Sequence, residues 1–228
     1  MSAARIHRLW LGLLAGLAIL AGCGGGDSGE APLELELIRA GQRTIAQGRG
    51  AATPPSQLTR ALLDKTDKTI LEATLERKDL TAYLSLSKGG SDRGITVWRT
   101  ADNVTLATRN GVLIATRGLG GDVLSSTVQV AGGRPGPATG GEHVQVIRVL
   151  DIQQLHLALA CDLEDLGPER VIIVERAHAT RHLRQRCAGG GGEVINEFWV
   201  DDQAGIVWQS RQWAGPHIGY LRFRRLTR

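Results

Sequence analysis

The sequence predicts a mainly β protein, either an antiparallel β-barrel or a curved β-sandwich, with one or two short N-terminal helices. Glycine accounts for 30 of the 228 residues, and several short runs alternate between apolar and polar side chains. This combination favours an all-β design over a helical one. The clearest alternation covers residues 71–86, around a charged turn at 77–79, and it is typical of an antiparallel hairpin with one solvent-facing side.

Further strands are expected downstream of this hairpin. Residues 95–99, 104–108 and 112–116 are short β-type runs, and Asn110-Gly111 between the last two is a strong hairpin turn signal. Residues 88–94 are expected to be a polar loop. Near the N-terminus, residues 33–47 and 56–64 carry the helix formers that predict the two helices.

The N-terminus has the features of an export signal. Arg5 and Arg8 precede an apolar run over residues 9–20, which is too short for a comfortable membrane span. The run ends in Leu-Ala-Gly-Cys, which resembles a bacterial lipobox and makes Cys23 the predicted lipidation site. A multiply acylated cysteine would anchor stably, because each buried methylene contributes about 0.8 kcal/mol.

These features predict three segments. Residues 1–22 are the lipoprotein signal peptide, residues 23–32 a flexible tether, and residues 33–228 a single β-rich domain. Gly24 follows the modified cysteine where an inner-membrane lipoprotein would typically carry aspartate. The expected location is therefore the periplasmic face of the outer membrane, with the chain held there by its lipid.

Net charge gives little support for nucleic-acid binding. The chain has 27 basic and 23 acidic residues, and loss of the signal peptide would remove Arg5 and Arg8. The mature chain would then carry a formal charge near +2, which lacks the excess expected of a nucleic-acid partner. No motif in the sequence predicts a cofactor.

Two cysteines remain after Cys23. In an oxidising periplasm Cys161 and Cys187 are expected to form a disulfide, which would stabilise the fold by roughly 3 to 4 kcal/mol. A simple hairpin about Gly167 would place Cys161 opposite Ile172. The pairing therefore requires a second turn near Ala179 or a neighbouring strand, and both arrangements remain open.

The last quarter of the chain predicts a three-stranded meander. Residues 194–201 and 206–213 form a hairpin, and residues 217–226 resume as a third strand after a proline break. With Asp201 facing Ile206, two tryptophans would lie opposite each other across the hairpin. These are Trp199 and Trp208, and with Trp213 they either pack in the core or form a surface for a glycan or a partner.

Catalytic and metal sites are not predicted. His178, His182 and Cys187 suggest zinc, but residues four apart on a strand are separated by about 13 Å. The adjacent Asp201 and Asp202 on a turn would point apart, which argues against a carboxylate pair for glycoside cleavage.

Four other features of the sequence have a structural interpretation. His156 lies on the polar side of an alternating strand and is expected to face solvent. The glycine-rich segment 117–126 lacks the spacing of a phosphate loop and is expected to be a turn. Residues 131–142 are expected to be an exposed glycine and proline loop. A run of arginines between residues 176 and 186 is either a solvated face or a surface for acidic polysaccharide or lipid headgroups.

The C-terminal motif resembles a known family. The string Asn-x-Phe-Trp-Val-Asp at 196–201, followed by Gly-Ile-Val-Trp-Gln-Ser-Arg-Gln-Trp at 205–213, is similar to the YjbF/GfcB family of lipoproteins linked to group 4 capsule and exopolysaccharide export. The similarity extends to Thr-Arg-Asn-Gly at 108–111, to residues 116–122, to the lipobox and to the paired cysteines. It covers most of the chain from about residue 58 to residue 226.

The resemblance implies an outer-membrane lipoprotein of antiparallel β structure that assists polysaccharide secretion. Its implied partners are an outer-membrane β-barrel, other periplasmic export proteins and the polysaccharide itself. No catalytic residue of the family can be placed on this sequence, so no enzymatic activity is expected. Two alternatives remain: a carrier or chaperone for lipid or lipoprotein, and a glycan-modifying enzyme.

Overall fold

The computed structural model describes residues 58–228 except residues 93, 131, 139 and 150–152, and it gives no side-chain description for residues 88–92. The predicted signal peptide, tether and first helix lie outside the described residues. The elements follow one another along the chain in this order: α2 (Arg60–Leu63), β1 (Ile70–Leu75), the 3-10 turn η1 (Glu76–Lys78), β2 (Leu80–Asp92), β3 (Ile95–Arg99), β4 (Thr105–Arg109), β5 (Val112–Arg117), β6 (Val123–Thr127), β7 (Gly141–Arg148), β8 (Gln154–Ile173), β9 (Arg176–Gly189), β10 (Gly192–Asp201), β11 (Ile206–Trp213) and β12 (Tyr220–Arg225).

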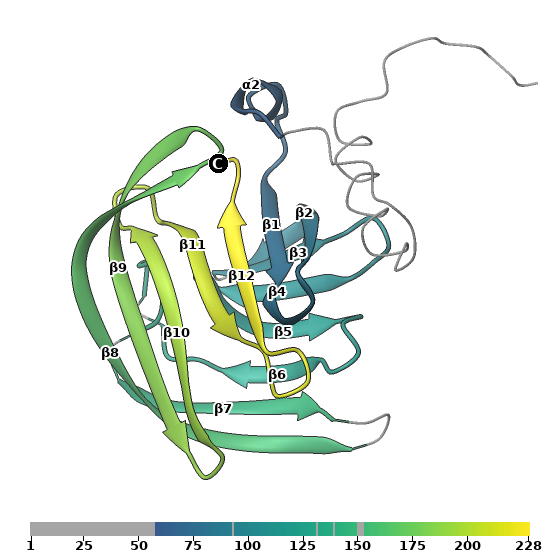
Figure 1. Cartoon of the computed structure of the whole chain (residues 1–228), viewed down its shortest axis with the longest axis vertical. Helices are drawn as coiled ribbons and strands as arrows, with labels where there is room; N and C mark the ends of the chain where they lie inside the picture. The colour runs from purple at the N-terminus through teal and green to yellow at the C-terminus, as the bar shows by residue number, and fades with distance from the viewer. Residues whose placement is uncertain (1–57, 93, 131, 139, 150–152) are drawn as a thin grey trace, which may run out of the picture. The chain divides into compact units, whose positions relative to one another are not determined.

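The described strands form one antiparallel sheet that curls into a nearly closed barrel (Figure 1). Their order in the sheet is β5-β4-β3-β2-β1-β12-β11-β10-β9-β8-β7-β6. Chain neighbours from β1 to β5 and from β6 to β12 therefore pair as hairpins, and the long-range pairing of β1 with β12 joins the two halves of the chain. The mainly β prediction is confirmed, as is the C-terminal meander of β10, β11 and β12.

The barrel is closed between β5 and β6 by side chains rather than by a strand ladder. Asp122 accepts hydrogen bonds from the Thr116 hydroxyl at 2.8 Å and from the Gly118 and Leu119 amides at 3.0 and 3.1 Å. The Val123 amide in turn donates to the Thr116 hydroxyl at 3.0 Å. The glycine-rich segment predicted to be a turn therefore joins the two ends of the sheet.

The side chain of Gln212 on β11 satisfies backbone groups at the free edge of β5. Its Oε1 accepts a hydrogen bond from the Leu113 amide at 2.8 Å, and its Nε2 donates to the Gly111 carbonyl at 2.9 Å. Gln212 is 2% exposed, so both backbone groups would otherwise be desolvated without partners. A buried glutamine therefore ties two strands that are not neighbours in the sheet.

The barrel interior holds the main apolar core. Inward positions of β1 and β12 face each other in register, with Ala73 opposite Phe223 and Leu75 opposite Leu221. Trp98 and Leu106 on β3 and β4 complete this core and are 3% and 2% exposed. The leucine alternation seen in the sequence therefore corresponds to the inward face of β1 and β2.

A second apolar cluster lies around α2, the tip of the β8–β9 hairpin and the end of β12. Arg60 on α2 donates to the carbonyl oxygens of Ile173, Val174 and Leu226 at 2.8, 3.1 and 2.9 Å. The guanidinium thereby joins the hairpin tip to the C-terminal strand. The described part of this helix is shorter than the predicted 56–64, and Thr59 caps it by accepting from the Leu62 amide at 3.3 Å.

Two other expectations are corrected. The polar loop expected at 88–94 is largely the extension of β2, which continues to Asp92. Gly167 does not form a hairpin turn, because β8 continues to Ile173 through a bulge between Asp165 and Gly167. Within the described part of the chain, no helix has the length and apolar character needed to cross a membrane.

Candidate functional site

The predicted tryptophan pair of the C-terminal hairpin does not form. Asp201 faces Ile206 and Val200 faces Val207, as expected, but Trp199 lies opposite Gln209. A β-bulge shifts the register by one residue between Trp199 and Val200, so Trp208 is not the cross-strand neighbour of Trp199, although Trp199 packs against the apolar cluster that contains Trp208.

Each of these tryptophans stacks on a histidine of β9 instead. Trp208 lies against His178 with ring centroids 3.6 Å apart, and Trp199 lies against His182 at 4.4 Å. Trp208 is only 2% exposed and belongs to the apolar cluster around α2, so packing accounts for it. Trp199 is half-buried and offers part of its surface to solvent.

The two histidines of the zinc hypothesis are held in other contacts. His182 bonds to Glu197 through Nε2 and lies 2.9 Å from Glu169 through Nδ1. Hydrogen bonds from Arg184 and His182 hold the pKa of Glu197 below its usual range, although burial of that carboxylate acts in the opposite direction. The polar cluster is therefore a set of side chains that satisfy one another's hydrogen bonds beside Trp199.

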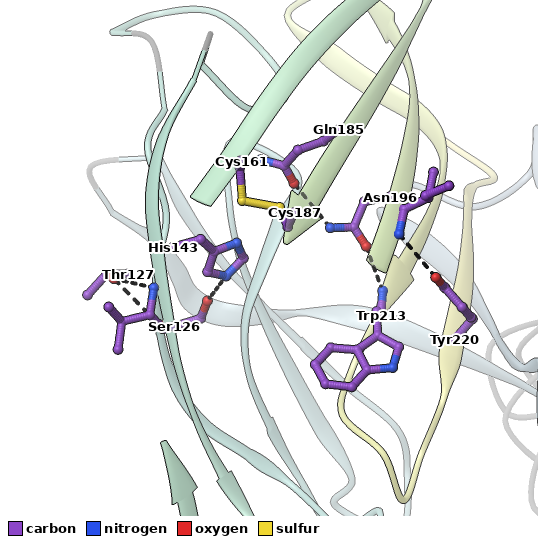
Figure 2. The surroundings of a disulfide bond; sticks show 11 residues. Ser126, Thr127, His143, Cys161, Gln185, Cys187, Asn196, Trp213 and Tyr220 are labelled. Atoms are coloured by element: carbon purple, nitrogen blue, oxygen red, sulfur yellow. Dashed lines mark hydrogen bonds between the residues drawn. A yellow bond between two sulfur atoms is a disulfide. The ribbon is translucent and has the colours of Figure 1, made fainter. Parts of the chain in front are cut away.

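Trp213 is the other half-buried tryptophan of this region, and Figure 2 shows how its strand is held. The Trp213 amide donates to Asn196 Oδ1 at 2.8 Å, and Asn196 Nδ2 donates to Gln185 Oε1 at 3.1 Å. Tyr220 lies opposite Trp213 on the neighbouring strand. The Arg211 guanidinium lies over the Tyr220 ring, with its Cζ 3.5 Å from the ring centroid. These contacts fix the backbone beneath a partly exposed aromatic patch.

Cys161 and Cys187 lie directly opposite each other on β8 and β9 and form a disulfide. The turn that brings them together is at Val174 and Glu175, both with positive φ, rather than at Gly167 or Ala179. The bridge is buried and packs against Leu159 on the inner face of the sheet.

His143 lies beside this disulfide and was not anticipated from the sequence (Figure 2). Its Nε2 bonds to the Ser126 hydroxyl at 2.5 Å, whereas its Nδ1 is buried without a partner in the described structure. Burial lowers the pKa of His143 to about 4. One ligand atom from each of His143, Cys161 and Cys187 falls within 4.8 Å of the others, but both sulfurs are already bonded to each other.

The arginines between residues 176 and 186 are each paired with a carboxylate. Arg176 lies 3.0 Å from Asp64, Arg181 lies 2.5 Å from Asp165, and Arg184 and Arg186 pair with Glu197 and Glu193 at 2.9 and 3.9 Å, respectively. Their charges are balanced within the protein, which favours the solvated-face interpretation of this run over the polyanion-binding one.

An arginine without a carboxylate partner among the described residues faces the inside of the barrel. Arg225 lies opposite Leu71 on the inward face of β12, and its Cζ is 5.1 Å from the centroid of the Trp98 ring. Its Nε donates to the Thr227 carbonyl at 2.9 Å, and within the described residues no carboxylate pairs with it. Burial lowers the pKa of Arg225 to about 10.

Arg225 lines a pocket of about 190 Å³ at one end of the barrel. The walls carry the side chains of Thr96, Thr108 and Ser210, and the rim is formed by the β4–β5 turn and the β10–β11 turn. Gly111 in the first turn has φ +86 and packs so closely on Val207 that a side chain there would clash. The rim is therefore held in place from both sides.

A second pocket, of about 140 Å³, is lined mainly by leucine and alanine side chains from β1, β2, β4 and β12. An apolar cavity of about 150 Å³ accommodates one benzene ring. The space is therefore too small for an acyl chain, which argues against the lipid-carrier alternative.

Asp201 and Asp202, which the sequence does not favour as a catalytic pair, have different hydrogen-bond partners. Asp201 accepts from the Ala204 amide at 2.9 Å and from Trp208 Nε1 at 3.2 Å, whereas Asp202 pairs with Arg134 at 3.2 Å. Burial of Asp201 opposes ionisation, but the hydrogen bonds it accepts lower its pKa. Both carboxylates therefore have structural partners. His156 is exposed, as predicted.

Arg225 and His143 could have been identified from alternation alone. Leu221, Phe223 and Arg225 occupy every second position of β12, so a cation appears where the pattern demands an apolar residue. His143, Gln145 and Ile147 share the inward face of β7 in the same way. A polar residue at an inward position is the sequence signal for a polar barrel interior.

The architecture and its polar pocket define the class of protein. It is an antiparallel β-barrel with a largely filled interior, and it resembles the crystal structure of the hypothetical lipoprotein YmcC from Escherichia coli K12. The two chains share 18% sequence identity with a TM-score of 0.65, and the likeness covers 89% of this chain and 98% of that one. At this identity the likeness shows the fold alone.

Residues 33–226 match the family described as group 4 capsule polysaccharide lipoprotein GfcB, YjbF. The chain therefore belongs to this lipoprotein family, as the C-terminal motif predicted. No curated protein matches the chain.

Proposed function

We propose that this chain is a non-enzymatic accessory factor in capsule or exopolysaccharide secretion or assembly. The observation that carries the proposal is family membership over residues 33–226, which spans the whole described barrel. The protein would act at the periplasmic face of the outer membrane, held there by lipid on Cys23. Residues 1–22 would be removed as the signal peptide, and residues 23–32 would tether the domain.

The contacts of the candidate catalytic residues support a non-enzymatic role. The two aspartates on the β10–β11 turn are held by structural partners, and the two cysteines are joined in a disulfide. Nucleophilic catalysis by cysteine needs a free thiolate. The protein would then act by binding, with an outer-membrane β-barrel, periplasmic export proteins and the polysaccharide as its partners.

The part-exposed tryptophans are the proposed contact surface for a glycan or a partner protein. Trp199 and Trp213 retain accessible surface, and aromatic rings with one wet side are enriched at interfaces. Trp208 would contribute by packing beneath this surface. Replacing Trp213 by alanine should reduce recovery of cross-linked partners from cells, whereas Trp208→Phe should not.

A deletion strain complemented with variants tests the proposal. Loss of the gene is expected to lower surface polysaccharide under inducing conditions, and the wild-type gene should restore it. Cys23→Ala should release the protein from the membrane fraction and fail to restore output. Unchanged polysaccharide in the deletion strain would refute the proposed function, and membrane attachment of the Cys23→Ala protein would refute the anchor.

A further inference from the structure

Arg225 makes the pocket at the end of the barrel unlike the rest of the interior. Its Nε is satisfied by the Thr227 carbonyl, and the described residues offer no hydrogen bond to its two terminal nitrogens. Arg225 lines a pocket whose rim includes the exposed Gly94 and Gly205. The pocket therefore connects Arg225 with solvent, while the described residues supply no counter-charge for its guanidinium.

A missing counter-charge is costly in a partly desolvated site. A charge without a partner destabilises a protein when it is only partly solvated, and the lowered pKa of Arg225 has burial as its cause, with no carboxylate among the described residues opposing it. A guanidinium presents parallel N–H groups that match a carboxylate in a bidentate arrangement. An anionic ligand entering the pocket would supply the missing partner.

The walls narrow the chemical class of that anion. Thr96, Thr108 and Ser210 provide hydroxyl groups that can both donate and accept hydrogen bonds. Gln212 Nε2 donates to the Ser210 oxygen at 2.9 Å, which leaves the Ser210 hydroxyl hydrogen to point elsewhere. Hydroxyl-bearing walls beside a single cation suit a ligand that carries several hydroxyl groups and one negative charge.

The volume sets the size. Since a cavity of about 150 Å³ holds a benzene ring, about 190 Å³ admits one six-membered ring with some substituents projecting through the mouth. A phosphate monoester carries about −1.5 to −2 at pH 7, so a single guanidinium would leave part of its charge unpaired. A carboxylate carries one negative charge, which matches the single positive charge of the Arg225 guanidinium.

We propose that this pocket binds one carboxylate-bearing sugar residue, a uronic acid, with its carboxylate on the terminal nitrogens of Arg225 and its hydroxyls on Thr96, Thr108 and Ser210. This inference deepens the proposed role in polysaccharide assembly and rests on it. The projecting part of the ring would carry the glycosidic bonds, so a chain end is the form that fits.

The test uses the full lipidated protein in detergent, labelled with nitrogen-15 at arginine, and follows the Arg225 Nε–H resonance by NMR. Sodium glucuronate should shift this resonance saturably, and glucose, the uncharged match, should not. A shift by glucose equal to that by glucuronate, or no saturable shift by glucuronate, would overturn the proposal. A stronger response to inorganic phosphate would replace the sugar acid with a simple anion site and overturn it as well.

Variants locate the binding. Arg225→Gln should weaken glucuronate binding at least tenfold, whereas Arg222→Gln, an exposed arginine on the same strand, should leave it unchanged. Because removal of a buried arginine can disturb folding, Thr108→Val provides a second variant that keeps the charge and the shape. It should weaken binding about threefold or more, and unchanged affinity in a folded Thr108→Val protein would count against the hydroxyl contacts.

Complementation separates this inference from the proposed function. If the deletion strain makes less polysaccharide and folded Arg225→Gln protein restores it fully, the pocket has no role and the accessory function stands. If the deletion strain has normal polysaccharide, the accessory function fails even where glucuronate binds. Reduced output with folded Arg225→Gln protein supports both.

Discussion

Gln212 on β11 holds the Leu113 amide of β5 at 2.8 Å, although these two strands are not neighbours in the sheet. The same side chain donates to the Gly111 carbonyl, so one residue satisfies two backbone groups at the edge of β5. Gln212→Leu keeps the approximate size but removes both of these bonds, together with the bond from Nε2 to the Ser210 oxygen. The free energy of unfolding should fall by about 2 to 4 kcal/mol, because two buried backbone groups lose their partners.

Urea denaturation followed by tryptophan fluorescence measures this loss. Gln209→Leu is the matched control, since Gln209 lies on the outer face of the same strand, is half-buried and makes no side-chain hydrogen bond to the residues that the structure describes. It should change stability by less than about 0.5 kcal/mol. Equal effects of the two substitutions would show that the Gln212 bridge does not stabilise the barrel.

The disulfide should contribute measurably to stability. The bridge closes a loop with a sequence separation of 26, for which the chain-entropy relation gives about 3.5 kcal/mol. A Cys161→Ala/Cys187→Ala double variant should lose about that amount in urea denaturation. Reductant should destabilise the wild type and leave the double variant unchanged, and a wild type insensitive to reductant would contradict this.

His143 should make the protein less stable in acid. Its pKa is about 4 in the folded state and near 6.5 when unfolded, so the unfolded chain takes up the proton first. The resulting loss in the free energy of unfolding is absent above about pH 6.5. It grows by up to about 1.4 kcal/mol per pH unit as the pH falls, and it levels off below about pH 4. Denaturation midpoints measured across this range give the slope.

The histidine contribution is isolated by difference. His143→Gln should flatten the pH dependence between 6.5 and 4, whereas His156→Gln, at an exposed position, should leave it as in the wild type. Carboxylates that titrate in the same pH range are present in all three proteins. Their contribution to the pH dependence of stability therefore cancels when the variants are compared with the wild type. Parallel curves for wild type and His143→Gln would refute the assignment.

Arg60 should control the stability of the β8–β9 tip. It donates three hydrogen bonds to carbonyl oxygens that belong to the tip and to the residue after β12. Arg60→Gln should speed amide exchange in residues 168–180 about 10- to 100-fold, since bonds from a charged donor are each worth about 1.5 to 3 kcal/mol. Hydrogen exchange followed by mass spectrometry measures the amide exchange rates of this segment directly.

Arg176→Gln is the comparison for Arg60. Arg176 pairs with Asp64 across half-exposed surface, and such pairs contribute about 0 to 1 kcal/mol. Exchange at the tip should then rise less than about fivefold. A larger effect from Arg176 than from Arg60 would mean that the surface ion pair, rather than the buried carbonyl contacts, holds the tip.

Most strands were predictable because they alternate on one face. The pairing of Leu71 with Leu84 and of Ala73 with Ala82 follows from the hydrophobic pattern and the short turn between them. The C-terminal meander was predictable for the same reason. The family was identified from the tryptophan-containing strand motif, which is local in sequence.

The β8–β9 hairpin was not predictable by those rules. Val174 and Glu175 form the turn with positive φ, which neither residue type favours, whereas Gly167-Pro168 carries strong turn chemistry but lies within β8. Pro168 is tolerated there because the ladder with β7 ends at Cys161, so beyond that point β8 has a free edge and needs no N–H on that side.

The bulge at Trp208 in β11 and the Arg225 pocket depend on packing between distant segments. Trp208 is buried in the cluster around α2 and the hairpin tip, so its place is set by residues far away in sequence. Arg225 occupies an inward position that alternation marks as apolar. The sequence shows this exception but not the absence of a counter-charge, which requires knowledge of the opposite wall.

The closure between β5 and β6 gives the barrel a defined line of mechanical weakness. Every other pair of neighbouring strands is held by a ladder of backbone bonds, whereas this junction depends on Thr116, Asp122 and a few amides. Separating it breaks the hydroxyl–amide bond between Thr116 and Val123, worth about 1 kcal/mol, and bonds to the Asp122 carboxylate worth about 1.5 to 3 kcal/mol each. Slow local opening of the barrel should therefore occur by separation of β5 from β6, while the eleven backbone ladders remain intact.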